Sequence, residues 1–347
     1  MRRLLICEGS RSYADGLRRL LEHDGDITVA AVCATAAEAI AALPRVQPDL
    51  VTMEIDLPGM DGLAAIEEIM SSRPLPILVI SAGVQASSHK AAALAAGALD
   101  AIPKSDLDLH DPGSAAAAVF RHRVRILAHA QVIRHPRAWL RNERAGPRLG
   151  RSAAVIGICG STGAPQVLAQ LLGPLPADYP IPILVVQHIS AGYTEGLARW
   201  LDQSVGLPVG MAADGAPVAP GAWIAPEGAH LKLARTGRLL LDRHTVTRQP
   251  HRPSGDVLFE SIAAVAGRAG VAIVLSGMGS DGASGAAAVR GLGGLAIVED
   301  YASSVVYGMP QAAIACGADL VMSPGEMAAC LTGLRYEPGR TGNDVPH

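Results

Sequence analysis

The feature that most constrains the fold of this chain is a series of short apolar runs, each followed by a glycine-rich turn and a helix-like stretch. The clearest examples lie at residues 153–158, 181–186 and 271–275. Runs of this length that are rich in Val and Ile are typical of parallel strands buried on both faces by crossover helices. The pattern therefore predicts an α/β fold built on a doubly wound parallel sheet.

A polar residue with catalytic potential follows each of these three runs: Ser161, His188 and Asp281. The carboxyl ends of parallel strands share one edge of the sheet, where ligands of open α/β sheets bind. Residues distant in sequence can therefore converge there as a nucleophile, a base and an acid. Ser161 would also lie at a helix N-terminus, where backbone N–H groups can hold an oxyanion. The combination predicts acyl-transfer chemistry.

Each of these residues has a plainer interpretation when taken singly. Ser161 could be a helix N-cap, His188 an ordinary histidine and Asp281 a turn residue. A phosphate or dinucleotide site is disfavoured, because the glycines around Ser161 are spaced G-x-x-G-x-x-G and no Lys-Ser or Lys-Thr pair ends the loop. The coincidence of all three residue types at the ends of predicted strands favours a hydrolase.

The first half of the chain alternates strand-like and helix-like segments. The predicted strands are 4–7, 28–33, 50–53, 77–81 and 101–103, and the predicted helices are 12–22, 36–43, 62–70, 89–96 and about 115–133. Such alternation with short loops predicts a five-stranded, flavodoxin-like domain. A chain of 347 residues is long for one core, so we expect two α/β domains.

An arginine-rich stretch separates the two halves. Residues 121–151 hold nine arginines and one acidic residue, and prolines and glycines interrupt any regular pattern after residue 133. The stretch is interpreted either as a solvated connector or as a seam that docks the domains or an acidic partner. The expected domains are therefore 1–120 and 151–335, with a linker at 121–150 and a tail at 336–347.

Composition argues against several classes of function. The formal net charge is -3, which predicts no overall basic surface for nucleic acid. No stretch is long and apolar enough to span a membrane or to act as a signal peptide. The five cysteines form an odd set without close pairs, which favours reduced thiols. We expect a cytoplasmic protein with no metal, no cofactor, no nucleic-acid partner and no direct membrane insertion.

The second half resembles a known family in six ordered segments. They are residues 157–165, 187–188, 224–231, 251–259, 276–282 and 303–310, with the sequences GICGSTGAP, QH, IAPEGAHL, HRPSGDVLF, SGMGSDG and SSVVYGMP. Through them the chain is similar to the chemotaxis response-regulator protein-glutamate methylesterases, the CheB family. The resemblance implies a Rossmann-like catalytic domain.

The resemblance also implies roles for individual residues. Ser161 attacks the side-chain methyl ester of a glutamate on a cytoplasmic helix of a methyl-accepting chemoreceptor, His188 takes its proton, and Asp281 orients the imidazolium. Met278 and Thr162 are the implied oxyanion and substrate contacts, with the N–H of Met278 as the oxyanion donor. Receptor glutamines are a second implied substrate, and a chemotaxis histidine kinase is a second implied partner.

Several residues depart from the family pattern. Cys159 and Ala164 replace glycines of the nucleophile segment, and residues 299–301, Glu-Asp-Tyr, replace the usual Gln-Asn/Asp-Glu. A Cβ at position 159 would strain the turn if φ there were unusual, and the second departure affects the fit of the substrate. Neither departure removes one of the three residues Ser161, His188 and Asp281. A separate alternative function is a catalytically weak adaptor that binds the receptor.

The segment at 251–254 has a structural and a functional interpretation. Ser254 is predicted to be the N-cap of a helix whose apolar face is Leu258, Ile262 and Val265. Arg252 is the functional alternative, as a contact for a substrate carboxylate.

The first half resembles a response-regulator receiver domain. Glu8, Ser81 and Lys104 match its acidic, hydroxyl and lysine positions, but Glu54 holds the position of the phosphate-accepting aspartate and Gly9 that of a second acid. The glycine removes a Mg²⁺ ligand, and glutamate is one methylene too long for the usual geometry. The resemblance therefore predicts a degenerate receiver that is not phosphorylated.

Two interpretations of this receiver pocket stay open. Glu54 reaches towards Lys104 and Ser81 and partly imitates the phosphorylated state, or the receiver is inert and kept only as a packing partner. Asp56 is disfavoured as an alternative acceptor, because it lies two residues past the acceptor position.

Overall fold

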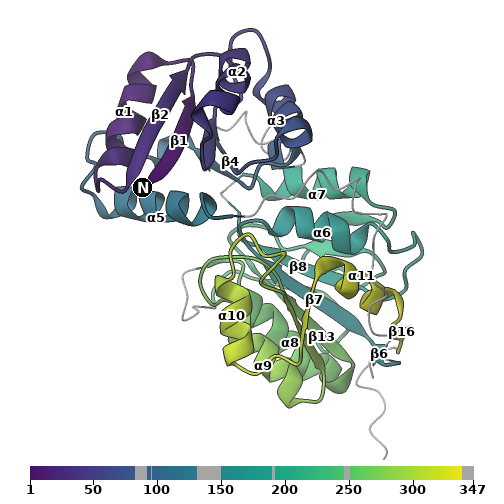
Figure 1. The fold of residues 1–347 in the computed structure, drawn as a ribbon. Helices are drawn as coiled ribbons and strands as arrows, with labels where there is room; N and C mark the ends of the chain where they lie inside the picture. The colour runs from purple at the N-terminus through teal and green to yellow at the C-terminus, as the bar shows by residue number, and fades with distance from the viewer. Residues whose placement is uncertain (83–91, 95, 131–149, 190–191, 246–250, 338–347) are drawn as a thin grey trace, which may run out of the picture. The chain divides into compact units, whose positions relative to one another are not determined.

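The computed structural model describes residues 1–82, 92–94, 96–130, 150–189, 192–245 and 251–337 (Figure 1). The chain forms two compact units, which divide between residues 139 and 140. Each unit is built on its own parallel sheet with helices on it, so the predicted fold class is confirmed. Most of the arginine-rich stretch, 131–149, lies outside the described residues. None of the described helices is long and apolar enough to cross a membrane.

The N-terminal unit has five parallel strands in the order β2-β1-β3-β4-β5. The strands are β1 (Arg2–Cys7), β2 (Ile27–Cys33), β3 (Leu50–Met53), β4 (Ile77–Ser81) and β5 (Asp100–Pro103). The helices with complete bounds are α1 (Arg11–Glu22), α2 (Ala36–Val46), α3 (Gly62–Ser72), the short η2 (Lys104–Asp106) and α5 (Ala115–Leu127). These bounds lie close to the predicted ones.

One predicted helix of this unit is too long, and another is only partly described. Helix α5 ends at Leu127 instead of residue 133, because the apolar stripe of Phe120, Val124 and Leu127 that packs into the core ends there. Four residues of the predicted helix at 89–96 lie outside the described residues.

The C-terminal unit has seven parallel strands in the order β15-β14-β13-β7-β8-β10-β9. The strands are β7 (Val155–Gly160), β8 (Ile183–Gln187), β9 (Val209–Met211), β10 (Ala222–Ile224), β13 (Gly270–Val274), β14 (Leu295–Glu299) and β15 (Leu320–Met322). Two short pairs stand apart from this sheet: β11 (His230–Leu233) with β12 (Leu239–Asp242), and β6 (Ser152–Ala153) with β16 (Arg335–Tyr336).

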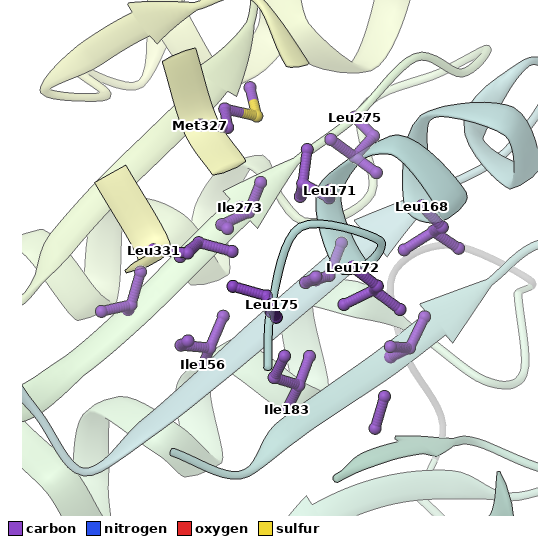
Figure 2. Close-up of a cluster of buried hydrophobic side chains, with 14 of the residues drawn as sticks. Ile156, Leu168, Leu171, Leu172, Leu175, Ile183, Ile273, Leu275, Met327 and Leu331 are labelled. Atoms are coloured by element: carbon purple, nitrogen blue, oxygen red, sulfur yellow. The ribbon is translucent and has the colours of Figure 1, made fainter. Parts of the chain in front are cut away.

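Helices cover both faces of the larger sheet. One face packs against α6 (Ala164–Leu172), α7 (Thr194–Ser204) and α11 (Pro324–Thr332), and Figure 2 shows part of this core. The other face packs against α8 (Gly255–Ala266), which η4 (Gly267–Ala269) follows, α9 (Ala283–Gly291) and α10 (Gly308–Ala315).

The side chains of β7 alternate between these two cores. Ile156 and Ile158 belong to the core shown in Figure 2, whereas Val155 and Cys159 belong to the core under α8 and α9. Residue 159 therefore points towards helix α8, which becomes important for the site.

The chain order reverses beside β7, because β8 lies on one side of it and β13 on the other. Such a switch point opens a crevice at the carboxyl ends of the strands. Ser161, His188 and Asp281 follow β7, β8 and β13, the three strands that meet there.

Candidate active site

Ser161 and His188 lie at equivalent positions on neighbouring strands. Gly160 of β7 pairs with Gln187 of β8, and each candidate residue is the first after that pair. The N–H of His188 donates to the carbonyl of Gly160 at 2.9 Å, and the amide side chain of Gln187 donates to the carbonyl of Ser161 at 2.7 Å. Adjacent strands are about 5 Å apart. The structure therefore places Ser161 and His188, the candidate nucleophile and base, side by side.

Asp281 joins them from the loop that follows β13. Its Oδ2 lies 2.8 Å from Nε2 of His188, at hydrogen-bond distance. Asp281 is buried, and Ser161 and His188 are half-buried. The three predicted residues thus gather at one end of the sheet, and Asp281 is the most deeply buried of them.

Three donors at the start of α8 surround the carboxylate of Asp281. Ser254 Oγ donates to Oδ1 at 2.7 Å, Gly255 N–H donates to Oδ2 at 2.6 Å, and Asp256 N–H donates to Oδ1 at 3.1 Å. Burial alone would raise the pKa of Asp281, but His188, Ser254 and Gly255 bring it down to about 2. Asp281 is therefore an anion at neutral pH.

Ser254 has a role that the sequence did not reveal. Helix α8 begins at Gly255, so Ser254 occupies the predicted N-cap position, but its hydroxyl bonds to Asp281 and makes no capping bond to the helix. A carboxylate from a distant loop has taken the place of the helix N–H groups as its partner. Only the tertiary structure brings that carboxylate to the helix start.

Cys159 lies inside β7 and has no positive φ, so the strain considered for this position is absent. Its Sγ is 3.9 Å from Oδ2 of Asp281. A Cβ added at Gly255 would lie 2.3 Å from that sulfur. The thiol therefore fits because residue 255 is glycine.

The Cys159 thiol completes a group of potential metal ligands with His188 and Asp281, whose ligand atoms all lie within 4.8 Å of one another. Burial, with the carboxylates of Asp281 and Asp256, raises the pKa of the Cys159 thiol well above its usual range. A protonated thiol is a poor metal ligand. The residues thus suit an orienting network better than a metal centre.

A second loop approaches Ser161 from β13. A Cβ added at Gly277 would lie 2.7 Å from Cβ of Ser161 and 2.2 Å from Sδ of Met309, so only glycine fits there. Met278, the expected oxyanion donor, follows directly and is half-buried. Thr162 is buried, and its carbonyl accepts a bond from Ser276 Oγ at 2.7 Å. Thr162 therefore follows Ser161 in sequence, and Met278 follows Gly277, which lies against Ser161.

His251 is a further residue of the site that the sequence interpretation missed. Its ring stacks on that of His188, with centroids 4.3 Å apart and planes at 19°. Burial and the neighbouring His188 lower the pKa of His251, so the neutral ring is favoured. In the sequence, the signal for a role of His251 was its position three residues before Ser254.

A small cavity of about 90 Å³ opens beside these two rings, and Glu227 and Arg252 also line it. The guanidinium of Arg252 donates to the carbonyls of Arg243 and Thr245, both at 2.7 Å. These bonds fix Arg252 in place while it lines the cavity.

The receiver pocket contains a compact ion group. Nζ of Lys104 lies 2.6 Å from Oε2 of Glu8 and 2.5 Å from Oε2 of Glu54, and 4.3 Å from the centre of the Tyr13 ring. Burial alone would lower the pKa of Lys104, but the two glutamates outweigh it and raise the pKa. The ammonium therefore stays charged between both carboxylates.

Glu54 was expected to contact both Lys104 and Ser81, and the structure shows one of these two contacts. Glu54 does reach Lys104, but among the described residues no group hydrogen-bonds to Ser81 Oγ, so the expected contact between Glu54 and Ser81 is not made. The residues also do not fit Mg²⁺, because Gly9 offers no ligand and the Lys104 ammonium already lies between Glu8 and Glu54.

Comparison with known proteins confirms the family resemblance. The family model for the CheB methylesterase matches residues 156–331 of this chain. The family model for the response regulator receiver domain matches residues 4–109. The protein-glutamate methylesterase/protein-glutamine glutaminase 4 of Geobacter metallireducens is 35% identical over 97% of this chain and 100% of its own length. A protein of the same name from Myxococcus xanthus is 37% identical, covering 95% of this chain and 96% of its own. The crystal structure of the Thermotoga maritima CheB methylesterase catalytic domain matches with a TM-score of 0.50 and 38% identity, over 52% of this chain and 98% of that one. The chain therefore belongs to the CheB methylesterase family and begins with a response regulator receiver domain.

Proposed function

We propose that this protein is a serine esterase that hydrolyses glutamate methyl esters and releases methanol, with Ser161, His188 and Asp281 as its catalytic residues. Ser161 Oγ attacks the ester carbonyl and His188 accepts its proton. Methanol leaves with that proton, and water then hydrolyses the acyl-enzyme. An amide follows the same course with ammonia as the leaving group, which accounts for a glutaminase activity.

The observation that carries this proposal is the position of His188. It lies beside Ser161 at the strand ends and 2.8 Å from a carboxylate that is held ionised. The Nε2 atom faces Asp281, which leaves Nδ1 for the serine proton. The imidazolium that forms when His188 takes the proton is then stabilised by the buried anion.

The relatives' names support an enzyme over the alternative of a non-catalytic adaptor. The proposed substrates are methylated glutamates on the cytoplasmic helices of methyl-accepting chemoreceptors, so the enzyme would act in the cytoplasm. The cavity beside His188 has one acidic and one basic wall residue, Glu227 and Arg252, which suits a polar helix surface.

The replacement Ser161→Ala tests this function directly. It removes the nucleophile, so we expect methanol release from a methylated receptor to fall by about 10³-fold or more. Ser204→Ala is the matched control, because Ser204 is exposed on α7 and bonds only to a carbonyl of its own helix among the described residues. Unchanged methanol release from Ser161→Ala would contradict the assignment.

For the receiver we propose a fixed regulatory state that does not depend on phosphorylation. The Lys104 ammonium, which would otherwise face a phosphoryl group, is bound by Glu54 from the acceptor position. The acceptor position itself holds Glu54 and not the aspartate that phosphorylation needs.

A further inference from the structure

Ser276 connects three segments of the active site. Its carbonyl accepts the N–H of Ser161 at 2.9 Å, and its hydroxyl donates to the carbonyl of Thr162 at 2.7 Å and accepts the N–H of Val306 at 2.9 Å. Residues 276–280, which we call the oxyanion loop, are therefore tied to the nucleophile segment and to the loop before α10. An interaction that holds Ser276 in place therefore also holds the backbone around Ser161 in place.

The remaining polar group of Ser276, its N–H, donates to Oε2 of Glu299 at 2.7 Å. Glu299 ends β14 and is fully buried. The triad proposed above does not use this carboxyl group, and a buried ionisable group without a strong cationic partner is costly when charged. Glu299 therefore needs an explanation of its own.

Two carboxyl groups compete for the single hydroxyl hydrogen of Ser303. Ser303 Oγ is 2.6 Å from Oδ1 of Asp300 and 3.0 Å from Oε1 of Glu299. A hydroxyl carries one hydrogen and can donate to only one of them. Asp300 is partly exposed and makes the shorter contact, so it takes that hydrogen. The contact with Glu299 is then a hydrogen bond only if Glu299 donates its own proton.

We propose that Glu299 acts as a positioning residue in its protonated form: its carboxylic acid donates to Ser303, accepts from Ser276, and so holds the oxyanion loop against Ser161. This inference rests on the proposed esterase function. Ionisation of Glu299 would place a buried negative charge behind the loop at which negative charge develops in the transition state. The rate should therefore fall when Glu299 loses its proton.

The electrostatic surroundings support a neutral carboxyl group. Burial, together with the Asp300 carboxylate, raises the pKa of Glu299 to about 7, while the bond from the N–H of Ser276 acts in the opposite direction. The strands β13 and β15 and the helix α10, which pack around β14, have no charged residue within their bounds. The one charged residue of α9, Arg290, is paired with Asp319.

The experiment is a pH profile of methanol release by the full-length protein and by Glu299→Gln, between about pH 6 and pH 9. Glutamine has the shape of the neutral acid and keeps a donor and an acceptor. For the wild type we expect kcat to fall on the alkaline side with a midpoint near 7, by about tenfold or more. Glu299→Gln should retain activity within about twofold at the acidic end and lack this alkaline fall.

Asp300→Asn is the matched second variant. It removes the charge that opposes ionisation of Glu299, so the alkaline fall should move to lower pH. An alkaline fall that persists unchanged in Glu299→Gln would overturn the proposal. So would a Glu299→Gln protein that is folded but inactive at every pH, because the anion would then be the working form.

A measurement that does not depend on enzyme activity tests this inference separately from the proposed function. The ¹³C resonance of the Glu299 carboxyl, assigned by its loss in Glu299→Gln, should titrate near pH 7. A titration at the ordinary value of glutamate, about 4.3, would contradict the inference even in an active enzyme. Absence of methanol at every pH would instead contradict the proposed esterase function.

Discussion

Asp281 receives its hydrogen bonds from three consecutive residues, Ser254 to Asp256, and one of them can be removed without touching the triad. Hydrogen bonds to charged groups contribute about 1.5–3 kcal/mol. We therefore expect Ser254→Ala to lower kcat by about tenfold, because the carboxylate becomes less well fixed opposite His188. Steady-state methanol release measures this effect.

The control for this variant is Ser261→Ala on the same helix. Ser261 Oγ bonds only to backbone groups of Leu258 and Leu233 among the described residues, so its loss should affect stability and spare kcat. Ser254→Ala should also raise the pKa of Asp281 from about 2. Ionised Asp281 stabilises the fold above its ordinary pKa, and this contribution is lost as pH falls through the folded pKa, so acid unfolding of the variant should begin at higher pH. Equal kcat values for the two variants would contradict this role of Ser254.

At the scale of elements, the oxyanion loop can approach Ser161 only because residue 277 lacks a side chain. Gly277→Ala would force its Cβ into Met309 and Ser161, so we expect kcat to fall by about 10²-fold through displacement of the reacting groups. Gly291→Ala at the end of α9 is the control, because nothing lies within 4 Å of its added Cβ. Circular dichroism would confirm folding, and an active Gly277→Ala protein would contradict the close approach.

The elements were also the most predictable level of this molecule. Short apolar runs mark the strands, and short loops fix their parallel order, so the strands that precede Ser161, His188 and Asp281 were predicted within a few residues. The stacking of His251, the hydroxyl of Ser254 turned to Asp281 and the contacts of Glu299 with Ser276 and Ser303 were not. Each depends on a partner from another segment, which local sequence patterns do not specify.

At the scale of the whole molecule, the receiver should not respond to a phosphoryl donor. Glu54 and Glu8 are both engaged by Lys104, and Gly9 supplies no Mg²⁺ ligand. Acetyl phosphate with Mg²⁺ should therefore neither label the full-length protein nor stimulate methanol release. Acid-labile phosphate on the protein measures the first point.

The matched variant restores both acids, as Gly9→Asp with Glu54→Asp. A side chain at position 9 would meet Pro58 and Ala34 at 3.5 Å or more, so it can be accommodated. We expect this double variant to acquire Mg²⁺-dependent phosphate. Stoichiometric phosphate on the wild-type protein would refute the assignment of a degenerate receiver.

The ion group of Lys104 with Glu8 and Glu54 has a consequence for the information that this protein can carry. A receiver normally reports the recent history of a kinase, because its charge state changes within the lifetime of an acyl phosphate. In the regulation proposed for this receiver, the corresponding negative charge would be encoded in the gene and present from the moment the chain folds. The output of the enzyme would then be set by how many copies the cell makes, and the proposed action on receptors would follow the time of protein synthesis instead of the time of a phosphorylation cycle.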